Sequence, residues 1–369
     1  MLMLKKTIAA LSLLSILAAC QNDENPSQPE PKPRQDINLT RAEQEFMDKG
    51  TDFAFRFFDQ VCSTEKEKPN VFVSPLSASL CLSMITNGAT DNTLAEMQDV
   101  LGFPANTFSL DDLNNYNQKL TSALLDLDNT TQLGIANSIW IEEGFKVYDS
   151  FVDVNKKMYD AQVQELDFTS PTAKDMINQW CATQTNNCIK EVIQEIPADV
   201  RMYLINALYF KGIWKSQFDK SATGQDNFTN VDGSQQKVAM MNQTATFNYT
   251  QTDDFSIAEL PYGNEAFSMV ILLPSGDKTL DESLPSLNYE NWKQWSKNMV
   301  GKELQIKLPR FKVEYDKELE EDMIAMGMKD AFDAYKAKFA NMSGAELYIG
   351  LLQQLSLIHI SEPTRPEPI

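Results

Sequence analysis

Apolar residues recur along the chain at two spacings, and each spacing predicts one kind of element. The stretch 39–61 opens with Thr40 and Glu43, spaced as a capping box, and continues with four apolar residues at near-helical intervals. These four are Phe46, Phe53, Phe57 and Val61. We predict a long amphipathic helix here, and further helices at residues 75–88, 91–102, 110–127, 151–159, 173–185, 289–297 and 319–328.

The second spacing is a two-residue alternation, rich in β-branched and aromatic residues, which predicts strands. A short β-rich run at 70–74 precedes a Ser-Pro break, and longer runs lie at 133–144, 161–168, 202–218, 237–250, 255–263, 266–274 and 303–316. Helices come first, and strands with scattered helices follow. This order predicts an α+β fold in one domain from residue 39, not the regular alternation of a parallel α/β sheet.

The first 38 residues have a different character. Residues 1–19 have two lysines and then an apolar run that is too short to span a bilayer, as in a signal peptide. The sequence "LAAC" resembles the bacterial lipoprotein box, which makes Cys20 the acylated first residue of the mature protein. Gln21 then favours the outer membrane, on its periplasmic or its external face. Residues 20–38 contain four prolines and almost no apolar side chains, which predicts a disordered tether.

Charge and residue content exclude several functions. The chain has 52 acidic and 32 basic residues, a formal charge of −20, which repels phosphate backbones and argues against nucleic acid as a partner. The single histidine, His359, lies near the end of the chain, so Ser–His, Cys–His and histidine-based zinc sites have no other source of imidazole. No glycine-rich phosphate loop or nucleophile elbow is present. We therefore expect no enzyme, no catalytic residue, no metal and no cofactor.

Four cysteines lie in the folded part of the sequence. Cys62 and Cys81 fall on apolar helix faces, which predicts buried thiols. Cys181 and Cys188 are about 10 Å apart if a single helix holds both, too far for a disulfide. An end to the helix between them would allow the bond, so both alternatives stay open.

Six segments resemble the serpin family, in the family's order, from about Leu39 to Gln354. They begin with "NVFVSPLSASLCLSMITNGATDNTLAEMQDVLGF" and include "LINALYFKGIWKSQFD", "FSMVILLPSG" and "LPRFKVEYDKELEEDMIAMGM". The resemblance implies three β-sheets with about nine helices. It also implies a monomer that inhibits serine proteases, or cysteine proteases, when a cut reactive loop inserts into the large sheet.

The same resemblance implies residues that control when the sheet opens. Asn206 on the long strand and Ser74 and Ser77 around the Ser-Pro break match the family's shutter, a cluster of hydrogen-bonding residues. Trp214 matches the aromatic residue at the breach, the place where insertion begins. The residues by themselves allow simpler roles: Ser77 as a helix cap, Asn206 as a satisfied strand residue, and Trp214 as core.

After Gln354 the sequence changes character. Residues 355–369 contain three prolines and no hinge of small residues, and they resemble translated sequencing-adapter sequence. We therefore expect a serpin domain at 39–354 that lacks the following central strand, the reactive centre and the closing core strands, with a non-native tail at 355–369. Such a chain would be inactive. A genuine, divergent tail is the alternative.

The sequence also allows two other functions. One is a non-inhibitory serpin that acts as a binding or scaffold module at the cell surface. Hinge composition would decide between the two serpin roles, since small residues enter a sheet easily and proline does not. The other alternative is a lipoprotein enzyme that uses carboxylates, which hydrolysis of a substrate would reveal.

Overall fold

The computed structural model describes residues 31–230 and 232–360 of the chain. Its helices are α1 (Arg41–Thr64), α2 (Pro75–Thr86), α3 (Asp91–Leu101), α4 (Leu110–Asp126), α5 (Asp149–Tyr159), α6 (Ala173–Gln184), α7 (Leu280–Ser283), α8 (Tyr289–Lys297) and α9 (Glu320–Met326). Its strands are β1 (Gln132–Glu142), β2 (Gln162–Leu166), β3 (Met202–Lys211), β4 (Gly224–Thr229), β5 (Gln235–Gln251), β6 (Phe255–Pro261), β7 (Ser268–Pro274), β8 (Val300–Pro309), β9 (Phe311–Glu318) and β10 (Gln353–Ile360).

Local sequence explains where most helices begin and end. Thr40 caps α1 by accepting from the Glu43 amide, and the Glu43 carboxylate accepts from the Thr40 amide in return, so the predicted capping box is confirmed. Gly102 ends α3 in the left-handed conformation at φ 85°. The helix predicted at 289–297 matches α8 at both ends.

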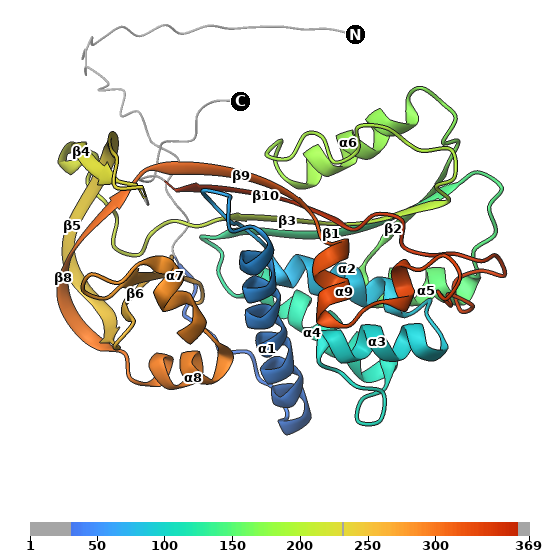
Figure 1. Ribbon diagram of the computed structural model, residues 1–369, viewed down its shortest axis with the longest axis horizontal. Coiled ribbons are helices and arrows are strands. Elements are labelled where there is room, and N and C mark those ends of the chain that lie inside the picture. Colours follow the sequence, from blue (N-terminus) through green and yellow to red (C-terminus); the bar gives the residue numbers. More distant parts are fainter. Residues whose placement is uncertain (1–30, 231, 361–369) are drawn as a thin grey trace, which may run out of the picture.

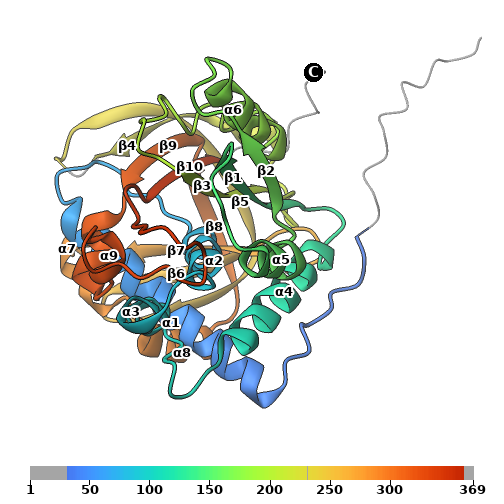
Figure 2. The same ribbon diagram turned by 90° about the vertical axis from the view of Figure 1, so that its right-hand side faces the viewer.

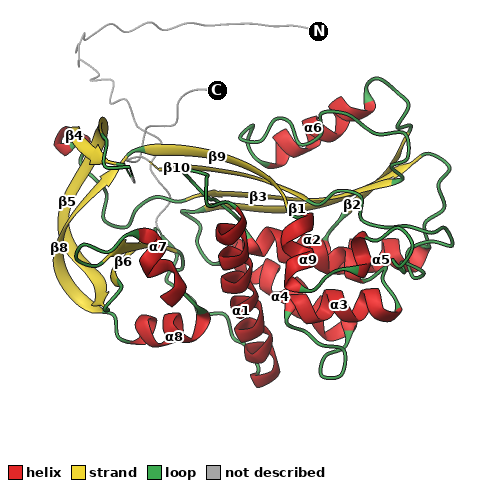
Figure 3. Ribbon diagram, in the orientation of Figure 1, coloured by secondary structure: helices red, strands yellow, loops and turns green. Residues whose placement is uncertain are grey.

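The strands form three sheets, with orders β2-β1-β3, β10-β9 and β4-β5-β6-β7, and β8 pairs with β5. Strands β1, β2, β3, β9 and β10 lie in one elongated layer (Figure 1). Helix α6 covers one face of this layer, helices α1 to α5 and α9 cover the other, and the five-stranded sheet closes one end (Figure 3). The predicted α+β class, three sheets and nine helices are confirmed within the described residues.

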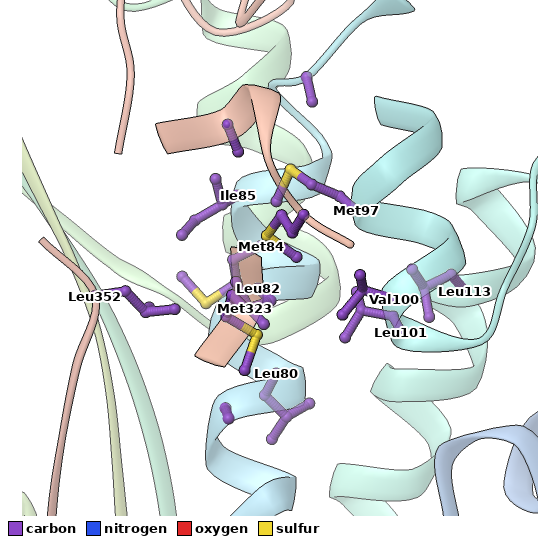
Figure 4. Packing of buried hydrophobic residues seen from close by; sticks show 14 of the residues in the cluster. Leu80, Leu82, Met84, Ile85, Met97, Val100, Leu101, Leu113, Met323 and Leu352 are labelled. Carbon is purple, nitrogen blue, oxygen red and sulfur yellow. The ribbon is translucent and has the colours of Figure 1, made fainter. Parts of the chain in front are cut away.

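The main core lies between this layer and the helices. Apolar residues of α2, buried on all sides, meet α3, α4 and α9, as Figure 4 shows around Leu82, Met84 and Met323. Leu352, one residue before β10, points into the same cluster (Figure 4). The segment that leads into β10 is therefore anchored by burial of an aliphatic side chain, which contributes ~2 kcal/mol.

Two predictions about extended segments are wrong. Residues 70–74 form no strand, although Val71 and Val73 pack against the core, because no strand edge in the described part of the chain pairs with them. We also expected no strand after Gln354. Instead β10 runs to Ile360 and pairs antiparallel with β9 through eight residue pairs. The open edge of β9 offers a ladder, and "LSLIHI" is apolar enough to form one.

Candidate functional site

A cleft divides the layer between β3 and β10. Among the described residues β3 pairs only with β1, and β10 pairs only with β9, so the two facing edges share no ladder. A cavity of about 1950 Å³ lies between them, lined by both strands and by the start of α2. Backbone amides and carbonyls along such edges lack hydrogen-bond partners, so the cleft is a candidate site for one more strand.

The two strands that border the cleft run in the same direction. Met202 at the start of β3 and Leu352 just before β10 belong to one apolar cluster, while Trp214 beyond β3 and Ile360 at the end of β10 belong to another. Figure 2 shows β3, β9 and β10 passing beside one another. With the ten residues of β3 at ~3.3 Å each, the cleft accepts an extended segment about 33 Å long.

On the β10 side of the cleft, Gln354 holds the start of α2. Its Oε1 accepts from the Ser74 amide at 2.9 Å, and its Nε2 donates to the Ser74 carbonyl at 2.8 Å. The Ser74 hydroxyl accepts from the Ser77 amide at 3.3 Å and caps α2, with Pro75 at the first helical position. Gln354 is 6% exposed, so both bonds to Ser74 are shielded from water.

On the β3 side of the cleft, Asn206 begins a buried polar network. Its Nδ2 donates to Asn137 Oδ1 at 2.8 Å across the β1–β3 pair, and Asn137 Nδ2 donates to the Tyr159 carbonyl at 2.7 Å. The Tyr159 hydroxyl then donates to Asn114 Oδ1 at 2.7 Å, and burial raises the pKa of Tyr159 to about 12. Asn206 Oδ1 is buried and has no hydrogen-bond partner in the described structure.

The three residues that match the shutter therefore fall on two sides of the cleft. Ser74 and Ser77 belong with Gln354 and β10, whereas Asn206 belongs with Asn137 and β1. The cavity is lined by Ser74, Ser77, Asn206 and Gln354, but not by Asn137. This division follows from the strand pairing. Because β3 and β10 do not pair with each other, no ladder of backbone hydrogen bonds joins the two groups of residues.

Trp214 lies where β3 ends. It forms an isolated antiparallel bridge with Tyr262, and the two rings stack at 4.3 Å between centroids. Gly212 passes so close to the Tyr262 ring that an added Cβ would lie 2.6 Å from it, so only glycine fits there. Trp214 is 5% exposed and packs in the cluster that contains Ile360. This places Trp214 at the end of the cleft where β10 also ends.

Replacing Asn206 with alanine should lower the free energy of unfolding by about 1–2 kcal/mol. The variant loses one hydrogen bond and leaves Asn137 Oδ1 without a donor, while it also removes the unpaired Oδ1 of Asn206 itself. Urea unfolding of the variant beside the parent protein measures this difference. Unchanged stability together with unchanged uptake of a strand would contradict a gating role for Asn206.

The sequence did not reveal Gln354 or Asn137 as site residues. Asn137 is a buried amide in the middle of an apolar strand, directly opposite Asn206 in the register. A polar residue at that place in "LGIANSIWI" was the available signal, but only strand pairing brings the two asparagines together. Gln354 stands at the last position of the serpin resemblance, where a buried glutamine among apolar neighbours was the corresponding signal.

The cysteines and the two ends of the chain were also singled out in the sequence. The four described cysteines are free, so Cys181 and Cys188 form no disulfide here. Cys81 and Cys62 are half-buried, and burial raises the pKa of Cys81 to about 12 and that of Cys62 to about 11. Cys20 and residues 361–369, where we expected the lipid anchor and the end of the tail, lie outside the described residues.

Neither a cluster of metal ligands nor a membrane-spanning helix occurs in the residues that the structure describes. In that part of the chain no three histidine, cysteine, aspartate or glutamate side chains gather as metal ligands. No helix there is both long and apolar enough to cross a membrane.

The described residues form an α+β domain whose largest layer holds an open slot between two parallel strands. The chain belongs to the serpin family, since the family model described as "Serpin (serine protease inhibitor)" matches residues 48–365. This match extends beyond Gln354 and covers β10.

Individual relatives agree with the family. The chain is 35% identical over 304 residues to "Serpin B6" of Macaca fascicularis, covering 79% of this chain and 80% of that protein. It is 32% identical over 317 residues to an "Uncharacterized serpin-like protein" of Methanosarcina acetivorans, covering 84% of this chain and 73% of that protein. Its structure is similar to that of the thermophilic serpin tengpin in the latent state, with TM-score 0.80, 30% identity and coverage of 89% and 87%.

Proposed function

We propose that this protein inhibits serine proteases, or cysteine proteases, by taking a cleaved loop into the cleft between β3 and β10. The observation that carries the proposal is the pair of unpaired, parallel edges that face the cavity. A strand that enters gains backbone hydrogen bonds on both sides, and this gain drives the insertion. The inhibitor needs no catalytic residue of its own, because the target protease supplies the nucleophile.

The direction of insertion follows from the strand directions. A segment that continues from β10 must turn back to enter the cleft, so it runs antiparallel to β10 and therefore also to β3. Insertion then begins beside Trp214 and Ile360 and proceeds toward Met202. Asn206 and the Ser74–Gln354 contact lie along this path, one on each side, so we propose that they control how readily the cleft accepts the strand.

We further propose that the inhibitor is tethered to the bacterial outer membrane by acyl chains on Cys20. The lipoprotein-like sequence before Cys20 supports this proposal, and the proline-rich residues 20–38 would hold the domain away from the lipid. Lys32 contacts Asp126 at 2.7 Å and Asn129 at 2.8 Å, so the described end of this segment runs along the end of α4. We also propose that the inhibitor acts as a monomer.

Residues 361–369 do not suit the role of the inserted strand. Pro363, Pro366 and Pro368 have no amide to donate to either edge of the cleft. We therefore propose that the printed chain forms no covalent complex with a protease, and that a version with its own small-residue hinge and loop after β10 does.

Covalent complex formation tests the proposed function. This chain and a variant in which residues 361–369 are replaced by a loop with a small-residue hinge are each incubated with serine proteases of differing specificity. We expect adducts that resist SDS only with the second protein, and none when the serine nucleophile of the protease is blocked beforehand. Adducts with the printed chain would contradict the role assigned to the tail. Cleavage of the second protein by every protease without adducts would favour the non-inhibitory binding role.

A further inference from the structure

Charged side chains are unevenly distributed along the cleft. Four exposed carboxylates line the end where β3 begins: Glu195, Asp199, Glu318 and Glu346. Asp199 comes three residues before Met202, and Glu318 is the register partner of Gln353 on β10. The residues thus come from the loop after α6, from the end of β9 and from the approach to β10, and all four line the cavity.

None of these four carboxylates has a basic partner within the described structure. Arg201 is the basic residue that lines the same end, and its guanidinium lies 2.6 Å from Glu142 Oε2, so its charge is already paired. Asp199 and Glu195 line the cavity together with Tyr203 of β3, and they contribute to the raised pKa of Tyr203, after the larger effect of burial. This end of the cleft therefore carries uncompensated negative charge.

The opposite end of the cleft is basic. Lys211, the last residue of β3, and Lys220 both line the cavity there, and both are exposed without an ion pair in the described residues. Lys215 is nearby but forms an ion pair with Glu265. The charge along the slot thus changes sign between the start and the end of β3.

We infer that the strand accepted by the cleft carries lysine or arginine at outward-facing positions in its C-terminal half, where acidic residues are disfavoured. The inference rests on the proposed function, which supplies the direction of entry. An antiparallel strand starts at the Lys211 end and brings its C-terminal half to the four carboxylates. The unpaired edges select extended backbone, and the carboxylates select among side chains.

The inserted strand has an inner face toward the main core and an outer face toward α6, and each face suits different side chains. Inner positions of β3 such as Leu204 pack on the main core, whereas outer positions such as Tyr203 pack under α6. Small apolar residues therefore suit the inner positions of the inserted strand, and its outer positions face the carboxylates and lysines that line the cleft. Because a slip of one residue would turn every side chain over, this alternation fixes the register.

Three synthetic ten-residue peptides test the inference on the printed chain. All alternate alanine or valine with threonine. The first has two lysines at outward positions of the C-terminal half, the second has glutamates at those positions, and the third has the two lysines in the N-terminal half. We expect the first to bind about tenfold more tightly than the second at low salt, with the third weaker than the first, and the difference to shrink at high salt.

A charge-reversed protein is the matched control. The double variant Asp199→Lys, Glu318→Lys should remove the preference for the first peptide over the second while the two bordering strands stay intact. Equal binding of all three peptides by the parent would overturn the charge inference and leave the strand site standing. Binding of none of the peptides, measured by native-gel shift and by the unfolding midpoint, would overturn the proposed function as well.

Discussion

Replacing Lys317 with alanine should lower the free energy of unfolding by about 3–5 kcal/mol, the largest effect that we expect from one substitution. Lys317 lies on β9, and its Nζ is 2.9 Å from Glu65 Oε1 and 3.2 Å from Asp322 Oδ2. The Asp322 side chain is 0% exposed and also accepts from the Thr64 hydroxyl at 2.8 Å. Without Lys317, Asp322 and Glu65 at the junction of α1, α9 and β9 would lose the ammonium group that pairs with both carboxylates.

The exposed Lys312 provides the control for Lys317. It lies on the same strand and pairs with Glu314, but its side chain is 56% exposed, so Lys312→Ala should change stability by less than ~0.5 kcal/mol. Hydrogen bonding to Lys317 holds the pKa of Glu65 below its ordinary 4.5. This part of the stabilisation is complete at neutral pH and is lost as the pH falls through the lowered value. Similar losses for Lys317→Ala and Lys312→Ala in urea unfolding would contradict the buried network.

Replacing Gln354 with alanine should lower the free energy of unfolding by about 2–3 kcal/mol and should speed the entry of a strand peptide. The variant leaves the amide and the carbonyl of Ser74 without their partners in a partly buried site. The first turn of α2 then loses its only hydrogen bonds to β10 among the described residues. The cleft should open more readily, because β10 is no longer tied to α2, whose Cys81 Sγ donates to the Leu204 carbonyl of β3 at 3.7 Å.

The adjacent residue separates this effect from a general weakening of β10. Gln353 is exposed and donates to Asp316 at 2.6 Å on the outer face, away from α2. Gln353→Ala should therefore change stability by no more than ~0.5 kcal/mol and should not speed the entry of the peptide as Gln354→Ala does. If both variants lose equal stability, or if Gln354→Ala takes up peptide at the parent rate, Gln354 does not hold the cleft.

Local signals predicted most elements, whereas pairing between distant segments decided the site. The capping box at Thr40 and the glycine stop at Gly102 act within a few residues, so both were visible in the sequence. The strand predicted at 202–218 ends at Lys211 instead, because the chain then leaves β1 and turns toward Tyr262. Apolar alternation alone does not indicate where a pairing edge stops.

In residues 355–360 the sequence predicted too little structure rather than too much. A change in sequence character after Gln354 predicted the loss of a strand, yet β10 forms there because β9 offers an edge. The opposition of Asn137 and Asn206 and the contact of Gln354 with Ser74, 280 residues away, depend on register and on tertiary packing. The sequence suggested gating residues by resemblance, but the division of that group across a cleft required the structure.

Hydrogen–deuterium exchange along β3 and β10 tests the central claim, that these strands border an open slot for one more strand. In the free protein, the β3 amides that do not bond to β1 should exchange quickly, and so should the β10 amides that do not bond to β9. Binding of the lysine peptide should slow the exchange of both sets together. The claim is contradicted if these amides are already protected in the free protein, or if they stay unprotected while the peptide is bound.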